Sequence, residues 1–344
     1  MPKQVVTFGE IMLRLSTPGF SRFVQSQTFD INYGGGEANV AAALSNYGLQ
    51  SHFVSKIPNH EIGQSAVNQL RRFGVGTEHI IRGGDRLGIY FLETGASQRP
   101  SKVIYDRADS AIMLMETDEV NWDKIFESKD WFHWTGITPA LGKRAQDNVL
   151  SACKAAKKAG VTISCDLNFR SKLWTTEEAQ SVMNPLMEYV DVCIANEEDA
   201  DKSLGLKAGV SDVESADLDE KGYFNLAKNL KSKYSFETVA ITLRESHSAS
   251  KNGWSAILHD NKDCIKPVRS SQYDIQLVDR VGGGDSFASG LIYGLLSKNN
   301  TKEALEFAVA ASCLKQTIPG DFNLVSVDEV EKLLSSGGSG RVER

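Results

Sequence analysis

Several features that define whole classes of proteins are missing from this sequence. Its five cysteines are odd in number and widely spaced, and they form no CxxC pair, so a disulfide framework is not expected. Its six histidines form neither HxxxH nor HExxH, which leaves a dedicated zinc site with little support.

Long apolar runs and an excess of basic residues are also absent. No apolar run approaches the roughly 18 residues that span a bilayer, and the first ten residues, MPKQVVTFGE, contain no apolar signal-peptide core. We therefore expect a cytoplasmic protein with no membrane partner. A net charge of −6 argues against a nucleic-acid partner, so an anionic ligand would need a locally positive site.

Two common nucleotide-binding motifs are lacking as well. No GxxxxGK[ST] occurs, which excludes a Walker P-loop. Gly34-Gly35-Gly36 lacks the GxGxxG spacing, and no acidic residue ends the next strand. A nicotinamide-dependent oxidoreductase is therefore a remote alternative.

What the sequence does contain is an alternation of strand-like and helix-like segments over most of its 344 residues. Such alternation predicts an α/β fold with a mostly parallel central sheet covered by helices on both faces. The predicted strands are Gln4–Gly9, Ser51–Lys56, Trp131–Gly136, Val161–Asp166, Asp191–Ala195, Val239–Leu243 and Trp254–Leu258; the predicted helices are Glu37–Tyr47, Ile62–Phe73, Arg144–Ala159, Gly284–Ser297, Thr301–Lys315 and Val327–Leu334.

The alternation is interrupted by segments that favour a second, smaller sheet. Leu87–Glu93 and Lys102–Arg107 are strand-like and are joined by a polar turn, which predicts an antiparallel pair. Met12–Ser16 and Phe23–Tyr33 have the same character. A small sheet beside an α/β core is a natural lid. We expect one domain over residues 1–336, with lid segments at about 11–33 and 87–108, and a flexible tail at 337–344. The acid-rich stretch Ser211–Lys221 is expected to be a solvated loop.

The sharpest local signal is the run VDRVGGGDSFASG, which starts at Val278. Gly282, Gly283 and Gly284 precede Asp285, which opens a predicted helix. Glycines let backbone amides approach a ligand closely, and a helix N-terminus adds unpaired N–H donors and partial positive charge. This arrangement suits an anion such as phosphate. A turn followed by a simple N-cap aspartate explains the local pattern equally well.

If a phosphoryl group binds there, Asp285 has a chemical task. A carboxylate beside the transferring phosphoryl can accept the proton of an attacking hydroxyl. The helix terminus would keep Asp285 ionised.

Gly-x-Gly-Asp at the start of a late helix, with Gly34-Gly35-Gly36 and Asn39 early in the chain, resembles the ribokinase-like (PfkB) carbohydrate kinases. The resemblance covers essentially the whole chain and implies a three-layer sandwich with a β-sheet lid. It implies that Gly282, Gly283 and Gly284 form an anion hole, that Asp285 is the catalytic base, and that the early glycines line the sugar site.

A second set of residues points to an acidic sugar. Alternation along the strand places Val103, Tyr105 and Arg107 on one face. A guanidinium can grip both oxygens of a carboxylate, and Arg170 follows the carboxyl end of another predicted strand, where α/β sheets bind ligands. Read alone, Arg107 fits a surface arginine better, and Asp321 fits a turn residue.

The segments LGIYFLE, YDRA and DLNFRSKLW resemble the 2-keto-3-deoxygluconate kinase branch of the family. That resemblance implies sugar-acid contacts from Gly34, Tyr90, Tyr105, Arg107, Arg170 and Asp321.

The nucleotide contacts follow the family less closely. Asn196-Glu197-Glu198-Asp199 is similar to the Asn-x-x-Glu motif that orders Mg²⁺ through water, with Asp199 in the last position. Thr242 and Arg244 stand where relatives carry a Gly-x-x-Gly turn, so the adenine contacts stay open. Asn196, Thr242, Arg244, Gly282 and Gly284 are the expected nucleotide contacts. Asp279-Arg280 replaces the family's Asp-Thr, which leaves dependence on a monovalent cation open.

The function expected on these grounds is Mg²⁺- and ATP-dependent phosphorylation of 2-keto-3-deoxygluconate. The alternatives are a fructokinase or another neutral-sugar kinase, and a non-catalytic sugar-binding protein. The gluconate and galactonate epimers are not distinguished. The family also implies a homo-oligomer formed through the lid.

Overall fold

The main sheet is mostly parallel, as the alternation predicts. The computed structural model describes residues 2–208 and 220–337. The strand order is β13-β12-β11-β10-β9-β8-β1-β4-β5, with β14 also paired to β12. All neighbours from β11 to β5 are parallel, whereas β12 runs antiparallel to β11, β13 and β14. The strands are β1 (Gln4–Phe8), β4 (Gln50–Ile57), β5 (Ile80–Arg82), β8 (Trp131–Thr135), β9 (Thr162–Asp166), β10 (Val192–Ala195), β11 (Thr238–Ser246), β12 (Lys251–Asp260), β13 (Val268–Arg269) and β14 (Tyr273–Gln276).

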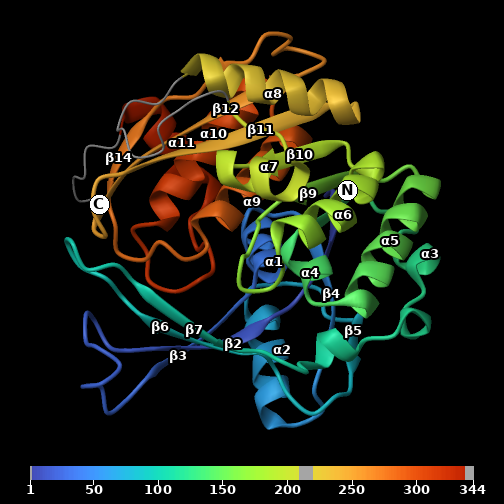
Figure 1. Ribbon diagram of the computed structural model, residues 1–344, viewed down its shortest axis with the longest axis vertical. Coiled ribbons are helices and arrows are strands. Elements are labelled where there is room, and N and C mark those ends of the chain that lie inside the picture. The colour runs from blue at the N-terminus through green and yellow to red at the C-terminus, as the bar shows by residue number, and fades with distance from the viewer. Residues whose placement is uncertain (1, 209–219, 338–344) are drawn as a thin grey trace.

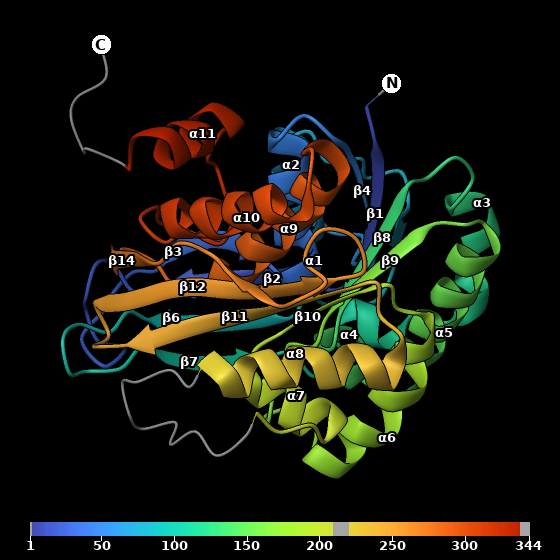
Figure 2. The same cartoon turned by 90° about the horizontal axis from the view of Figure 1, so that it is seen from above.

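Helices cover both faces of this sheet, and Figure 2 shows the two layers on either side of it. One layer holds α1, α2, α9, α10 and α11, and the other holds α4 to α8. Their bounds, with that of α3, are α1 (Gly36–Asn46), α2 (Glu61–Arg72), α3 (Trp122–Ile125), α4 (Ile137–Ala140), α5 (Lys143–Lys158), α6 (Thr176–Leu186), α7 (Glu197–Leu204), α8 (Glu220–Tyr234), α9 (Gly283–Ser297), α10 (Thr301–Lys315) and α11 (Val327–Ser336).

Successive side chains of β1 pack against the two helical layers in turn. Val5 packs in the cluster that contains α9 and α10, whereas Val6 and Phe8 pack in the cluster that contains α5. All three side chains are fully buried. A parallel strand covered on both faces must be apolar on both, which is why the segment reads as a continuous apolar run.

The second sheet has four strands in the order β3-β2-β6-β7. They are β2 (Met12–Ser16), β3 (Asp30–Gly34), β6 (Ile89–Glu93) and β7 (Lys102–Asp106). Figure 1 shows this sheet at lower left, projecting beyond the helical layers. The expected strand from Phe23 was wrong before Asp30, because residues 23–29 pair with no strand.

Cross-strand register gives this small sheet two different faces. Asn32, Arg14, Tyr90 and Tyr105 lie in one row across all four strands. Ile31, Leu15, Phe91 and Ile104 form the adjacent row, whose side chains point the other way because strand residues alternate. The first row is polar, and the second is apolar.

The sequence analysis named no helix at α3, α4, α6, α7 or α8 and no strand at β5, β13 or β14; of these, α3, α4, β5, β13 and β14 have at most four residues each. Residues 211–219 of the acid-rich stretch and 338–344 of the tail lie outside the described residues. Within the described part of the chain, no helix is long and apolar enough to cross a membrane.

Candidate active site

One large cleft opens at the carboxyl ends of the parallel strands, beside the polar face of the small sheet. Its volume is about 1310 Å³. Its lining includes Tyr90 and Tyr105 of the small sheet, Asp166 at the end of β9, and Asp285 at the start of α9. Segments from both ends of the chain therefore meet in one site, at the edge where α/β folds bind ligands.

The glycine loop and the first turn of α9 form part of this cleft. Gly282, Gly283, Gly284 and Asp285 all line it. Gly282 has φ +79°, and a Cβ there would lie 2.2 Å from the backbone oxygen of Asp321. Only glycine fits this position without strain. Amides of the loop and of the helix terminus are thus available to an anion in the cleft.

Asp285 is held by the other glycine-rich segment. The side-chain amide of Asn39, on α1, donates a hydrogen bond of 2.6 Å to Oδ2 of Asp285. Burial raises the pKa of Asp285 to about 6, and the Asn39 hydrogen bond opposes that rise. The carboxyl is therefore mostly ionised at neutral pH, and its pKa is close enough to 7 for it to accept a proton.

Asp321 is linked to the small sheet. It accepts hydrogen bonds from Arg14 Nη1, at 2.7 Å, and from the Tyr90 hydroxyl. Arg14 also donates through Nη2 to Asp279, at 2.6 Å. All three side chains of this ion-pair group are at least nine-tenths buried. Sequence reasoning missed Arg14, although its place in a strand opposite Tyr90 was a usable signal.

Arg107 lines the cleft beside Tyr105 but already has a partner. Its Nη2 donates to Glu10, whose other oxygen accepts from Ser110 at 2.7 Å. Val103, Tyr105 and Arg107 all line the cleft, which confirms the face predicted from alternation.

Arg170 lies near carboxylates at the carboxyl end of β9 and in the first turn of α7. It lowers the pKa values of Asp166, Asp199 and Asp285, although burial raises all three. The pKa of Asp166 stays well above its usual value because of burial and of the charges on Asp199 and Asp285. Asp166, which the sequence reasoning missed, is thus a group that a cation would stabilise.

The expected nucleotide residues also lie in this cleft. Asn196, Asp199, Thr242 and Arg244 all line it. Asn196 is the N-cap of α7, and its side chain accepts from the amide of Asp199 at 2.8 Å. Asp199 in turn accepts from the Phe169 amide at 2.9 Å. Arg280 adds a second guanidinium close to Arg244: burial and then Arg244 lower its pKa.

Gly34 differs from the other expected sugar contacts, since the cleft lining includes Gly35 and Gly36 but not Gly34. A Cβ on Gly34 would lie 2.1 Å from the Asp321 carboxylate. Gly34 therefore makes room for Asp321, and its effect on a ligand is indirect.

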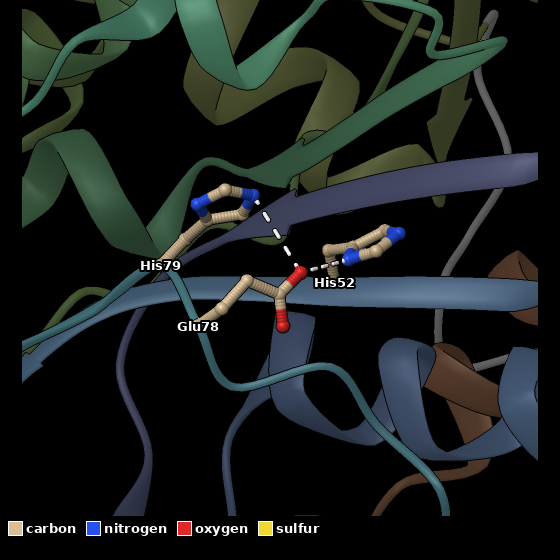
Figure 3. Close-up of side chains that lie close together, drawn as sticks. All are labelled: His52, Glu78 and His79. Carbon is tan, nitrogen blue, oxygen red and sulfur yellow. Dashed lines mark hydrogen bonds and ion pairs between the residues drawn. The ribbon is translucent and has the colours of Figure 1, made fainter.

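A group of two imidazoles and a carboxylate lies away from this cleft (Figure 3). Glu78 pairs with His52 Nδ1 and lies 3.6 Å from His79 Nε2. The ligand atoms are within 4.8 Å of one another. Lys129 Nζ lies 3.5 Å from His52 Nε2, the ring nitrogen that does not contact Glu78. His52 is near the start of β4, opposite the carboxyl ends, and we assign the group to holding residues 77–80 against that strand.

A glycine loop that suits an anion, the buried Asp285 and residues of the small sheet thus share one cleft of an α/β fold. Comparison with known proteins identifies the family: the model of the pfkB family carbohydrate kinases matches residues 2–324. The chain belongs to this family and is a carbohydrate kinase.

Named relatives are sugar-acid kinases. A 2-dehydro-3-deoxygalactonokinase of Haloferax volcanii is 34% identical over 99% of each chain. A 2-dehydro-3-deoxygluconokinase of Bacillus subtilis is 29% identical over 94% of this chain and 92% of the relative. The crystal structure of a 2-dehydro-3-deoxygluconokinase from Thermotoga maritima has 54% identity and a TM-score of 0.92, covering 98% of this chain and 99% of that one.

Proposed function

We propose that this kinase transfers the γ-phosphoryl group of ATP to the terminal hydroxyl of 2-keto-3-deoxy-D-gluconate. The products are 2-keto-3-deoxy-6-phosphogluconate and ADP. The observation that carries the proposal is that one cleft is lined by Asp285, the glycine loop and four arginines, which are Arg107, Arg170, Arg244 and Arg280. The names of the most similar relatives point to the same substrate class.

In the proposed reaction, the sugar hydroxyl attacks the γ-phosphorus in line with the leaving ADP. Asp285 accepts the hydroxyl proton as the new O–P bond forms and the bond to the ADP oxygen breaks. The amides of Gly282 to Asp285 stabilise negative charge on the transferring group. Asn39 orients the Asp285 carboxylate through its 2.6 Å hydrogen bond.

Nucleotide phosphates would meet Arg244 and Arg280, which line the cleft and whose mutual repulsion an anion would relieve. Mg²⁺ would be held by Asp166 and Asp199, since both line the cleft and since burial and then the charge on Asp199 raise the pKa of Asp166. Bound there, directly or through water, Mg²⁺ would neutralise phosphate charge.

Specificity for an acid is proposed to come from Arg107 and Arg170, with Tyr90 and Tyr105 beside the sugar. One observation favours a neutral sugar instead: Glu10 pairs with Arg107 and offsets its charge. Arg170 favours the acid, because its side chain is exposed in the cleft and makes no ion pair among the described residues; its Nη1 donates to the backbone oxygen of Phe169. Asp166, Asp199 and Asp285 contribute negative charge around it.

The apolar face of the small sheet supports the proposal that the protein is a homo-oligomer formed through its lid. Ile31 is 67% exposed and Ile104 is 54% exposed, in a single row with Leu15 and Phe91. A second copy of the same sheet would cover such a row by apolar burial.

A coupled assay of ADP release with Mg·ATP tests this function. It should compare 2-keto-3-deoxygluconate, its galactonate epimer, gluconate, fructose and ribose. Preference for the two keto-deoxy acids is expected, and preference for fructose or ribose would contradict the substrate. Asp285→Asn should lower kcat by about 10³-fold or more while sugar binding, measured by calorimetry, stays nearly intact. Turnover close to that of the wild type would refute the role of Asp285.

A further inference from the structure

Beneath the glycine loop lies a lysine whose whole side chain is buried. Lys315 is the last residue of α10 and has no exposed surface. Its Nζ donates to the backbone oxygens of Asp279, at 3.2 Å, of Gly320, at 2.7 Å, and of Val281. No ion pair among the described residues includes it. The three donors of this ammonium therefore meet three carbonyls and no carboxylate.

Those carbonyls belong to the two loops that shape the site. Asp279 and Val281 directly precede the glycine loop, and Gly320 precedes Asp321. The end of α10 holds the same segments by further bonds: the Ser312 hydroxyl donates to the Gly283 oxygen at 2.7 Å, and the Gln316 oxygen accepts from the Val278 and Asp279 amides. Lys315 thus acts at the point where both loops converge.

Peptide geometry connects this ammonium to the cleft. In a trans peptide the carbonyl and the N–H point in opposite directions, and no cis peptide occurs among the described residues. The Val281 oxygen bonds Lys315, so the amide of Gly282 in the same peptide points away from the lysine, and Gly282 lines the cleft. A cation on the carbonyl also polarises the peptide, which strengthens its N–H as a donor.

An apolar side chain in this space would leave the three carbonyl oxygens without the donors that Lys315 supplies. Burying an ammonium costs several kcal/mol unless its hydrogen bonds are made. Without a cation, three carbonyl oxygens would converge on one another. Rings of backbone carbonyls are what proteins use to bind K⁺, an ion comparable in size to an ammonium group.

We propose that Lys315 is a tethered monovalent cation: it positions the glycine loop for phosphoryl transfer and makes the kinase independent of added K⁺. This rests on the proposed phosphoryl transfer but not on the identity of the sugar. Lys315 does not touch substrate and is a positioning residue.

The test compares the wild type with Lys315→Ala, Lys315→Met and the control Lys298→Met in choline chloride, then with added KCl, NH₄Cl or LiCl. Lys298 is the C-cap of α9 and donates to a carboxylate, that of Glu331. Wild type and control should change less than about twofold with any salt. Lys315→Ala should lose about 100-fold in kcat, the loss expected for a displaced oxyanion donor, and regain about tenfold with KCl or NH₄Cl but not with LiCl. Lys315→Met fills the space and should gain nothing.

A second readout needs no substrate. K⁺ should raise the melting temperature of Lys315→Ala, and not that of the wild type or of Lys315→Met, because an ion that binds only the folded state stabilises it. A wild type that requires K⁺ would overturn the proposal whatever the variants do. So would a folded Lys315→Ala with full activity, or one that K⁺ neither activates nor stabilises. Failure of the sugar assignment would appear separately, in the substrate preference of the wild type.

Discussion

The side-chain amide of Asn39 lies 2.6 Å from a carboxylate oxygen of Asp285, although 246 residues separate them in the chain. The bond joins the N-terminal part of α1 to the N-terminal turn of α9, two helices that pack against each other. The two glycine-rich segments are thus parts of one site, and the Asn39 hydrogen bond favours the ionised form of Asp285, the proposed base.

This contact predicts a pH dependence. Burial raises the pKa of Asp285 to about 6, and the proposed base must be ionised to accept a proton, so kcat/KM should fall as the pH drops through about 6. Asn39→Ala removes a hydrogen bond that favours the carboxylate, so the midpoint should move up by roughly one pH unit. The measurement is kcat/KM from pH 4.5 to 8 at saturating Mg²⁺.

Titration of ATP itself is common to both proteins and cancels in the comparison. Asn46→Ala is the matched control, because Asn46 lies on the same helix but bonds the Val325 oxygen. An identical midpoint for Asn39→Ala and the wild type would contradict the role of Asn39.

Arg107 should affect the acidic substrate selectively. Arg107→Lys keeps a charge for Glu10 but loses the planar fork, so KM for the sugar acid should rise about tenfold with kcat less changed. Arg99→Ala is the control, since Arg99 lies on the same lid but pairs with Glu93. Steady-state kinetics with 2-keto-3-deoxygluconate measures both. An unchanged KM would remove Arg107 from carboxylate binding.

Arg14 should matter for stability. Arg14→Met leaves the buried carboxylates of Asp279 and Asp321 without their cation, and loss of one partner of a buried pair costs about 3–5 kcal/mol in unfolding free energy. Burial already raises the pKa of Asp321, which Arg14 opposes. Adding Asp321→Asn to Arg14→Met should therefore recover part of the loss. Urea unfolding of the four proteins of this cycle gives the coupling, and strictly additive losses would show that the pair is not coupled.

The apolar face of the small sheet predicts self-association of the protein, which a single charged substitution on that face should disrupt. Ile104→Lys places an ammonium in the exposed apolar row, so it should shift the protein to a smaller species in sedimentation velocity. Ile62→Lys changes an isoleucine of similar exposure, 49%, on α2 and should have no effect. A monomeric wild type, or an Ile104→Lys variant of unchanged mass, would exclude assembly through this face.

Local patterns in the sequence determined much of this protein. Apolar alternation and glycine stops predict most of the strands and helices, and Thr301–Lys315 is bounded as expected. The glycine loop and Asp285 were readable because a helix N-terminus and its preceding turn are set by neighbouring residues. The two inserted strands also stand out, since their period changes from 3.6 to 2.

Tertiary structure alone decided which charges meet. Arg14 is an ordinary strand residue in the sequence, and its partner Asp321 lies 307 residues away. Lys315 reads as a basic helix end facing solvent, yet the fold buries it under three carbonyls. Burial and long-range pairing depend on how separate elements pack, and no local period encodes that packing. The local sequence therefore predicts where the glycine loop lies, and the fold determines which side chains hold that loop in place.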